Sequence, residues 1–170
     1  MQQFFNVYLK EIKMRILGID PGMAIVGWAV IEVNNDDKPQ LISAGSIQTD
    51  KKQSDAQRLK EIHQDLNVLI QKYKPDIASI EKLFFFKNQK TIIPVAQARG
   101  VILLALEENQ IPFEEYTPIE IKQTITGFGR ASKIEVAQMI KILLEGQNIP
   151  KLDDTTDAIA MAICCNRNKF

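Results

Sequence analysis

The sequence predicts an α/β protein, with a mixed five-stranded sheet and helices on both of its faces. Three apolar segments separated by turn residues come first, which is typical of an antiparallel meander. Strand-like segments then alternate with helical ones, and that order requires parallel strands. The length of 170 residues, 45% of them hydrophobic and 25% charged, suits one domain with a sizeable core.

The first three strands are expected at Arg15–Asp20, Ile25–Val33 and Gln40–Thr49. Pro21-Gly22 favours a hairpin turn between the first two, because proline presets φ and glycine permits a positive φ. Asn34–Asp37 supplies the second turn. These segments should therefore pair as an antiparallel meander.

The first helix should begin at Ser54, which forms a capping box with Gln57, and should end near Tyr73. Pro75-Asp76 then breaks the helix, and Ile77–Glu81 is a buried strand. The chain thus returns to the sheet through a helical connection, as a parallel strand requires.

The second helix is expected over Thr91–Asn109, with Pro94 tolerated in its first turn. Phe113–Tyr116 is the last strand. Capping boxes at Thr117–Glu120 and Ser132–Glu135 begin two further helices.

The last helix should start near Asp153 or Asp154 and run to about Asn166. It is rich in small apolar residues, so it should pack closely on the sheet. Its adjacent cysteines, Cys164 and Cys165, lack the spacing of a metal pair and are expected to be free and buried.

Composition excludes several classes of protein. The formal net charge is zero, which argues weakly against a sequence-blind polyanion binder. No apolar run approaches a membrane span, and residues 1–13 lack the features of a signal peptide. We expect a cytoplasmic protein with a domain over residues 14–170 and an extension of unknown role before it. Met14 opens the first strand and is a candidate start.

A few acids are placed unlike surface acids. Asp20 and Glu81 each end an apolar strand, while Asp154 and Asp157 share a face at the start of the last helix. Each has a plain structural alternative: a turn residue, a lysine partner or a helix cap. Together they would repel one another unless a cation bound them.

Oxygen ligands without a histidine or cysteine cluster favour Mg²⁺, with Mn²⁺ as a substitute. Acids from two strand ends and one helix could hold two ions about 4 Å apart, as in phosphodiester hydrolysis. One ion would activate water and the other would stabilise the leaving oxygen. The single histidine, His63, is expected to be an ordinary helix residue.

Six segments together carry a family resemblance. GIDPG with GWAVIEV, then IEKLFFFKNQKT and QARG, then IKQTITGFGRASKIEVAQMI, and last DDTTDAIAMAI resemble the RuvC family of Holliday-junction resolvases. They occur in the family's order and cover nearly all of residues 14–166. The resemblance implies an RNase H-like fold, a homodimer, and Mg²⁺-dependent paired nicking of four-way DNA junctions. It also suggests that a branch-migration helicase complex of RuvA and RuvB type presents the junction.

The resemblance also assigns roles. The family's four catalytic, metal-binding acids match Asp20, Glu81, Asp154 and Asp157, and Asp153 leaves the third open by one residue. Two basic positions of the family match Lys122 and Lys133. We expect Lys133 to steady charge that develops during the reaction, and both lysines to contact DNA.

The segment Ile80–Thr91 joins a carboxylate, three phenylalanines and a basic loop. Phe84 matches a family position that resembles a base-stacking residue; Phe85 and Phe86 stack likewise or pack in a core or dimer interface. Lysines in this loop would contact phosphates, which position DNA without reading its sequence. Gly127–Arg130 is either a plain turn or a close approach to phosphate. The expected basic face comprises Lys82, Lys87, Lys90, Arg99, Lys122, Arg130 and Lys133.

The sequence therefore predicts an endonuclease that leaves 5′-phosphate and 3′-hydroxyl ends and nicks two strands symmetrically as a dimer. Three alternatives stay open: an RNase H-like nuclease acting on RNA, a junction-binding protein that does not cleave, and an actin-like phosphotransferase. The last is disfavoured because the chain is too short for two such lobes. The preferred cleavage sequence and the dimer surface are not predicted.

Overall fold

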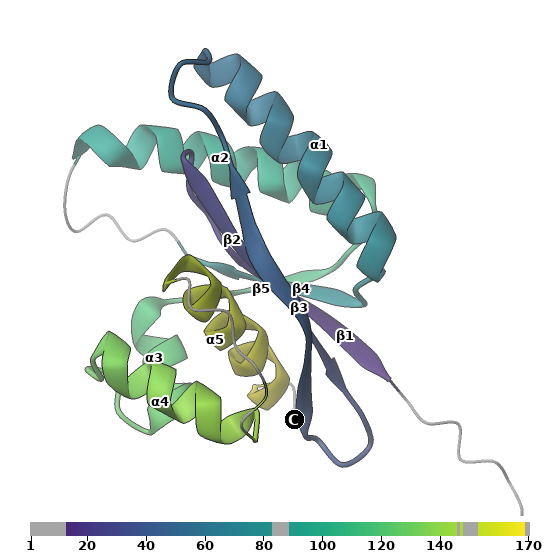
Figure 1. Cartoon of the computed structure of the whole chain (residues 1–170), viewed down its shortest axis with the longest axis vertical. Coiled ribbons are helices and arrows are strands. Elements are labelled where there is room, and N and C mark those ends of the chain that lie inside the picture. Colours follow the sequence, from purple (N-terminus) through teal and green to yellow (C-terminus); the bar gives the residue numbers. More distant parts are fainter. Residues whose placement is uncertain (1–12, 83–88, 146, 148–152, 169–170) are drawn as a thin grey trace, which may run out of the picture.

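A mixed sheet separates two helical layers (Figure 1), as the sequence predicts. The computed structural model describes residues 13–82, 89–145, 147 and 153–168. The strands are β1 (Met14–Asp20), β2 (Ile25–Val33), β3 (Pro39–Gln48), β4 (Ile77–Glu81) and β5 (Phe113–Tyr116). The helices are α1 (Asp55–Tyr73), α2 (Gln89–Glu108), α3 (Pro118–Thr126), α4 (Lys133–Leu143) and α5 (Asp153–Arg167).

The strands lie in the order β3-β2-β1-β4-β5. β2 pairs antiparallel with both β1 and β3, so the predicted meander is confirmed. β4 pairs parallel with β1 and with β5. The parallel pairing brings the carboxyl ends of β1 and β4 to the same edge, which matters for the site below.

Local capping explains where three helices begin. Ser54, Thr117 and Ser132 each accept a hydrogen bond from a backbone N–H three residues later, and the side chain at that position bonds back to the cap. All three capping boxes were predicted. They satisfy backbone donors that a helix start otherwise leaves unpaired.

Two local predictions are wrong in detail. The second helix begins at Gln89 rather than Thr91, so Pro94 lies inside it and not in its first turn. Gly22 does not have a positive φ. Its turn needs glycine for space instead, because a Cβ there would lie 2.3 Å from the carbonyl oxygen of Ile25.

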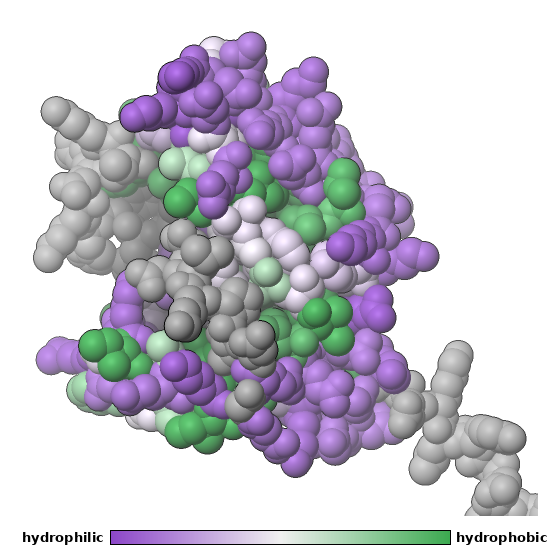
Figure 2. Space-filling model, in the orientation of Figure 1, coloured by the Kyte–Doolittle hydropathy of each residue, from purple (hydrophilic) through white to green (hydrophobic). Residues whose placement is uncertain are grey.

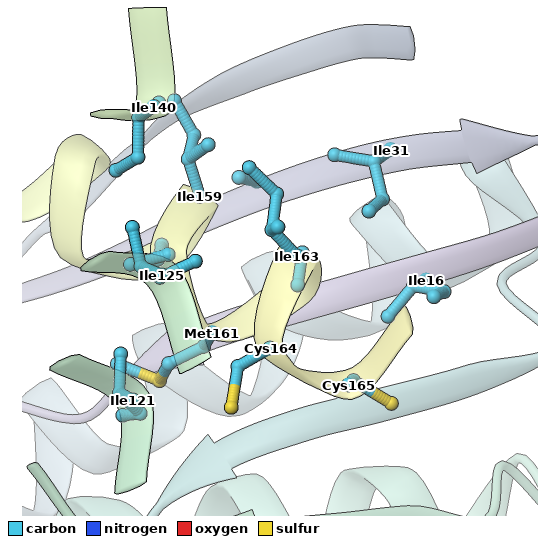
Figure 3. Packing of buried hydrophobic residues seen from close by; sticks show 14 of the residues in the cluster. Ile16, Ile31, Ile121, Ile125, Ile140, Ile159, Met161, Ile163, Cys164 and Cys165 are labelled. Atoms are coloured by element: carbon cyan, nitrogen blue, oxygen red, sulfur yellow. The ribbon is translucent and has the colours of Figure 1, made fainter. Parts of the chain in front are cut away.

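Each face of the sheet has its own core. One core, between the sheet and α1 and α2, is built around Leu17, Ile19 and Ile80. The other lies between the sheet and the layer of α3, α4 and α5; Figure 3 shows Ile16 and Ile31 of the sheet beside the side chains of α5. Cys164 and Cys165 are buried and form no disulfide, as predicted.

The hydropathy of the surface also differs between the helical layers and the sheet. Hydrophilic side chains cover the outer sides of the helical layers in Figure 2, and a paler band crosses the middle, where Figure 1 places the edge strand β3. Of the helices in the described residues, none is both long and apolar enough to cross a membrane.

Candidate active site

Two acids lie side by side because of strand register. Ile19 of β1 is aligned with Ile80 of β4 in the parallel pair, so the next residues, Asp20 and Glu81, end neighbouring strands at one edge. Side chains alternate along a strand, and Ile19 and Ile80 point into the core beneath α1 and α2. Asp20 and Glu81 therefore face the other layer, where α5 packs.

The third acid comes from α5. Asp157 lies in the second turn of this helix and is half-buried. Its Oδ2 is 3.1 Å from Nζ of Lys133, the first residue of α4. The exposed side chain of Lys133 thus reaches back over the acid, and two helices contribute to one site.

The three acids line a single cleft of about 340 Å³. Its floor and walls are largely apolar, and two lysines stand at its rim. The lining residues are Asp20, Glu81, Pro118, Ile121, Lys122, Lys133, Val136, Asp157, Ala160 and Met161.

The electrostatics of the cleft favour a cation. Burial raises the pKa of the Glu81 carboxyl above its ordinary value, and the negative charge of Asp157 raises it further. The ammonium of Lys133 and a hydrogen bond with Asp20 oppose this rise in pKa without cancelling it. A carboxylate that is costly to ionise beside other carboxylates gains stability when a positive ion binds.

The donor set fits a hard divalent ion, because all of the acids in the cleft offer oxygen. Among the side chains that the structure describes, no three acid, histidine or cysteine groups lie together in an arrangement that could hold a metal ion. The predicted set has a fourth member, Asp154. Its backbone lies in α5, but the side chains of Asp153 and Asp154 are outside the described residues, so the choice between them stays open.

Apart from Arg99, the residues of the predicted basic face and the neighbouring phenylalanines fall into three groups. Lys122 and Lys133 line the cleft, and Lys82 and Arg130 are exposed. Phe84, Phe85, Phe86 and Lys87, together with the side chain of Lys90, lie outside the described residues.

Arg99 does not belong to an open basic face, contrary to the sequence-based expectation. It is largely buried and forms an ion pair with Glu115 of β5. Burial lowers the pKa of its guanidinium. The error arose because α2 turns this residue toward the sheet, and spacing along the chain does not reveal a partner on another strand.

His63 is an ordinary residue of α1, as predicted, and its side chain forms a hydrogen bond with a neighbouring helix: its Nε2 lies 2.8 Å from Oε2 of Glu108. Sequence reasoning missed the apolar walls of the cleft. One signal was available, since Ala160 and Met161 follow Asp157 by three and four residues and so share its helical face.

The sequence matches one protein family over nearly its whole length. Residues 16–165 match the family model for crossover junction endodeoxyribonuclease RuvC. A protein of that name from Halothermothrix orenii is 52% identical over 89% of this chain and 91% of its own length. One from Caldicellulosiruptor saccharolyticus is 45% identical with the same coverage of both chains.

A solved structure also matches closely. Thermus thermophilus RuvC in complex with a Holliday junction substrate superposes with a TM-score of 0.83 and 29% identity. The match covers 89% of this chain and 92% of the other. The likeness thus includes the sheet and both helical layers.

Proposed function

Because the chain belongs to the RuvC family of crossover junction endodeoxyribonucleases, we propose that it resolves four-way DNA junctions by paired hydrolysis of phosphodiester bonds. The observation that carries this proposal is the convergence of Asp20, Glu81 and Asp157 in one cleft with Lys122 and Lys133 at its rim. Acids in the cleft suit a metal-assisted reaction, and cations at the rim suit a phosphate backbone. The nuclease domain spans residues 14–170, and residues 1–13 form an extension.

The ions in this proposal are Mg²⁺, two per subunit, with Mn²⁺ as a substitute. Asp20, Glu81, Asp157 and Asp154 would hold them. Bound there, the ions supply an activated water and charge stabilisation at the leaving oxygen. The raised pKa of Glu81 supports this assignment, because burial first and the charge of Asp157 second disfavour its ionised form, and a bound cation would offset both.

The lysines position the scissile strand. Lys133 contacts Asp157 at 3.1 Å, and its side chain is 74% exposed, so it can turn from the acid to a phosphate when DNA enters. Lys122 stands on α3 at the same cleft. Lys133 then contributes positive charge next to the reacting phosphate, and Lys122 contributes to binding.

The remaining proposed DNA contacts come from two other segments of the chain. Arg130 is exposed on the turn between α3 and α4, the two helices that carry Lys122 and Lys133. Lys87 and Lys90 follow Glu81 along the chain and would hold phosphates, while Phe84 would stack on an unpaired base. None of these contacts reads a base sequence through hydrogen bonds to base edges.

Paired nicks require two clefts, and therefore a homodimer. We place its interface on the α2 face, which comprises Ile93, Ala96, Gly100 and Leu104. Ile93 is 66% and Leu104 52% exposed, at positions where a solitary domain gains nothing from apolar residues. A Cβ on Gly100 would meet no atom within 4 Å, so the backbone there is open to close approach by a second helix.

The working complex would include a branch-migration helicase of RuvA and RuvB type, in the cytoplasm.

The proposal is tested by incubating a synthetic four-way junction with the wild type and with Asp157→Asn, in Mg²⁺ and in chelator. We expect symmetric, Mg²⁺-dependent nicks from the wild type. The variant should bind the junction but nick at least about 100-fold more slowly, because it loses a charged ligand and even the loss of a group that only orients a ligand costs about 10–100-fold. Asp65→Asn is the matched control, since Asp65 is exposed on α1, in the other layer.

Three results would count against the proposal. Full nicking by Asp157→Asn would remove Asp157 from the reaction. Tight junction binding without nicking by the wild type would mean a binding protein, and cleavage of RNA in preference to the junction would mean a different nuclease.

A further inference from the structure

Gly18 and Ser79 occupy equivalent places beneath the two strand acids. Gly18 precedes Asp20 by two residues, and Ser79 precedes Glu81 by two, so each shares a strand face with its acid. The two are also aligned with each other in the β1–β4 pairing. Two residues before the acids, on the same face of the sheet, a glycine and a serine therefore lie side by side and face α5.

Gly18 allows the backbone of α5 to touch the sheet. A Cβ at this position would lie 2.0 Å from the carbonyl oxygen of Ala158 and 2.8 Å from the amide nitrogen of Ala162. Both atoms are helix backbone, so no side chain could rotate away to make room. Any other residue at position 18 would push α5 off β1, and Ala158 is the residue after Asp157.

Ser79 fixes the same helix by a hydrogen bond. Its hydroxyl donates to the carbonyl oxygen of Met161 at 2.9 Å, and Ser79 is fully buried. Met161 follows Asp157 by four residues and so lies one helical turn away on the same face. Its side chain extends toward Ile121 of α3 in Figure 3, where both residues line the cleft.

These two contacts hold the backbone of α5 at two points within about one turn of Asp157. We propose that Gly18 and Ser79 are positioning residues, which set the distance between Asp157 and the pair Asp20 and Glu81 and thereby the affinity of the cleft for divalent cations. The inference rests on the proposed function, since it concerns the same cleft. Groups that orient metal ligands commonly change metal affinity when they are lost, although they touch no ion themselves.

Ser79→Ala tests this inference, because it removes the hydrogen bond without adding volume. Mn²⁺ serves as the probe, with the unbound ion measured by electron paramagnetic resonance in the absence of DNA. We expect Mn²⁺ binding about tenfold weaker than in the wild type. The Mg²⁺ concentration for half-maximal junction nicking should rise by the same factor, while the junction Kd in chelator stays unchanged.

Ile70→Val is the matched control for lost stability, since Ile70 is buried in the core beneath α1, away from α5. Ser79→Cys keeps the shape and a weaker donor, so its Mn²⁺ affinity should be intermediate. If Ser79→Ala and Ser79→Cys bind Mn²⁺ as tightly as Ile70→Val does, the inference is wrong. A wild type that binds Mn²⁺ but cleaves no junction would overturn the proposed function instead, and the binding comparison would still decide the role of Ser79.

Discussion

Glu32 of β2 is a carboxylate that belongs to the fold rather than to the cleft. It is 7% exposed, and it accepts a hydrogen bond from Nε of Arg15 at 3.1 Å while Nζ of Lys13 lies 3.4 Å from its other oxygen. Arg15 also donates to the backbone oxygen of Tyr73, which links β1 to the end of α1. The hydrogen bond from Arg15 lowers the pKa of Glu32, more than burial raises it. In Glu32 the hydrogen bond from Arg15 outweighs burial, whereas in Glu81 burial and the charge of Asp157 outweigh the ammonium of Lys133.

Glu32→Gln should therefore destabilise the protein by about 1 kcal/mol at neutral pH, a modest value because Arg15 and Lys13 are partly exposed to solvent. A carboxyl whose pKa is lowered by folding stabilises the native state above its unfolded pKa, and this contribution disappears as the pH falls through the folded pKa. The difference between wild type and variant should thus shrink below about pH 4. Urea unfolding at pH 7 and pH 3 measures it, with the exposed Glu114→Gln as control. A difference that is independent of pH would show that the ion pair is not its source.

At the scale of elements, capping chemistry decides where helices begin and end. The sequence contains a capping box before α1, α3 and α4, and each helix starts there. The start of α2 has no such signal among its first residues, and it is the helix whose start was misplaced. Gly127 ends α3 with φ of 80°, and its N–H donates to the carbonyl oxygen of Gln123. The Gln123 side chain in turn bonds the backbone of Gly127 and Gly129, which supports the turn interpretation of this segment.

Gly127→Ala should cost about 1–2 kcal/mol, because a Cβ opposes the left-handed conformation. The cost is conformational and not steric, since an added Cβ would meet no atom within 4 Å. Gly127→Asn should cost less, because asparagine tolerates this conformation better than alanine does. Thermal unfolding of the three proteins gives the order. Equal losses for alanine and asparagine would contradict this explanation.

At the scale of the whole molecule, the sheet separates the cleft from the α2 face. The cleft opens on the layer of α3, α4 and α5, and the α2 face belongs to the other layer. A dimer formed through α2 therefore leaves both clefts accessible to DNA. Pairing of nicks would then follow from symmetry, with no contact between the clefts themselves.

Leu104→Glu should shift the protein from dimer to monomer, because it places a charge on a face that must be desolvated. Sedimentation equilibrium measures the shift, and at concentrations where the variant is monomeric the two nicks should lose their pairing. Ile142→Glu is the control, since Ile142 is 66% exposed on α4, away from the α2 face. A Leu104→Glu protein that stays dimeric would move the interface elsewhere.

The sequence by itself determined the elements and their order, because turn, capping and periodicity signals act over a few neighbouring residues. It also singled out Asp20 and Glu81, which end apolar strands, and Asp154 and Asp157, which share a face at the start of an apolar helix. Tertiary structure alone decided that β1 and β4 align these acids, that Lys133 reaches Asp157, and that Arg99 turns away to Glu115. The contact of α5 with Gly18 and Ser79 belongs to the same class. Such contacts join residues that are far apart in the chain, so they depend on sheet order and helix packing, which no local signal encodes.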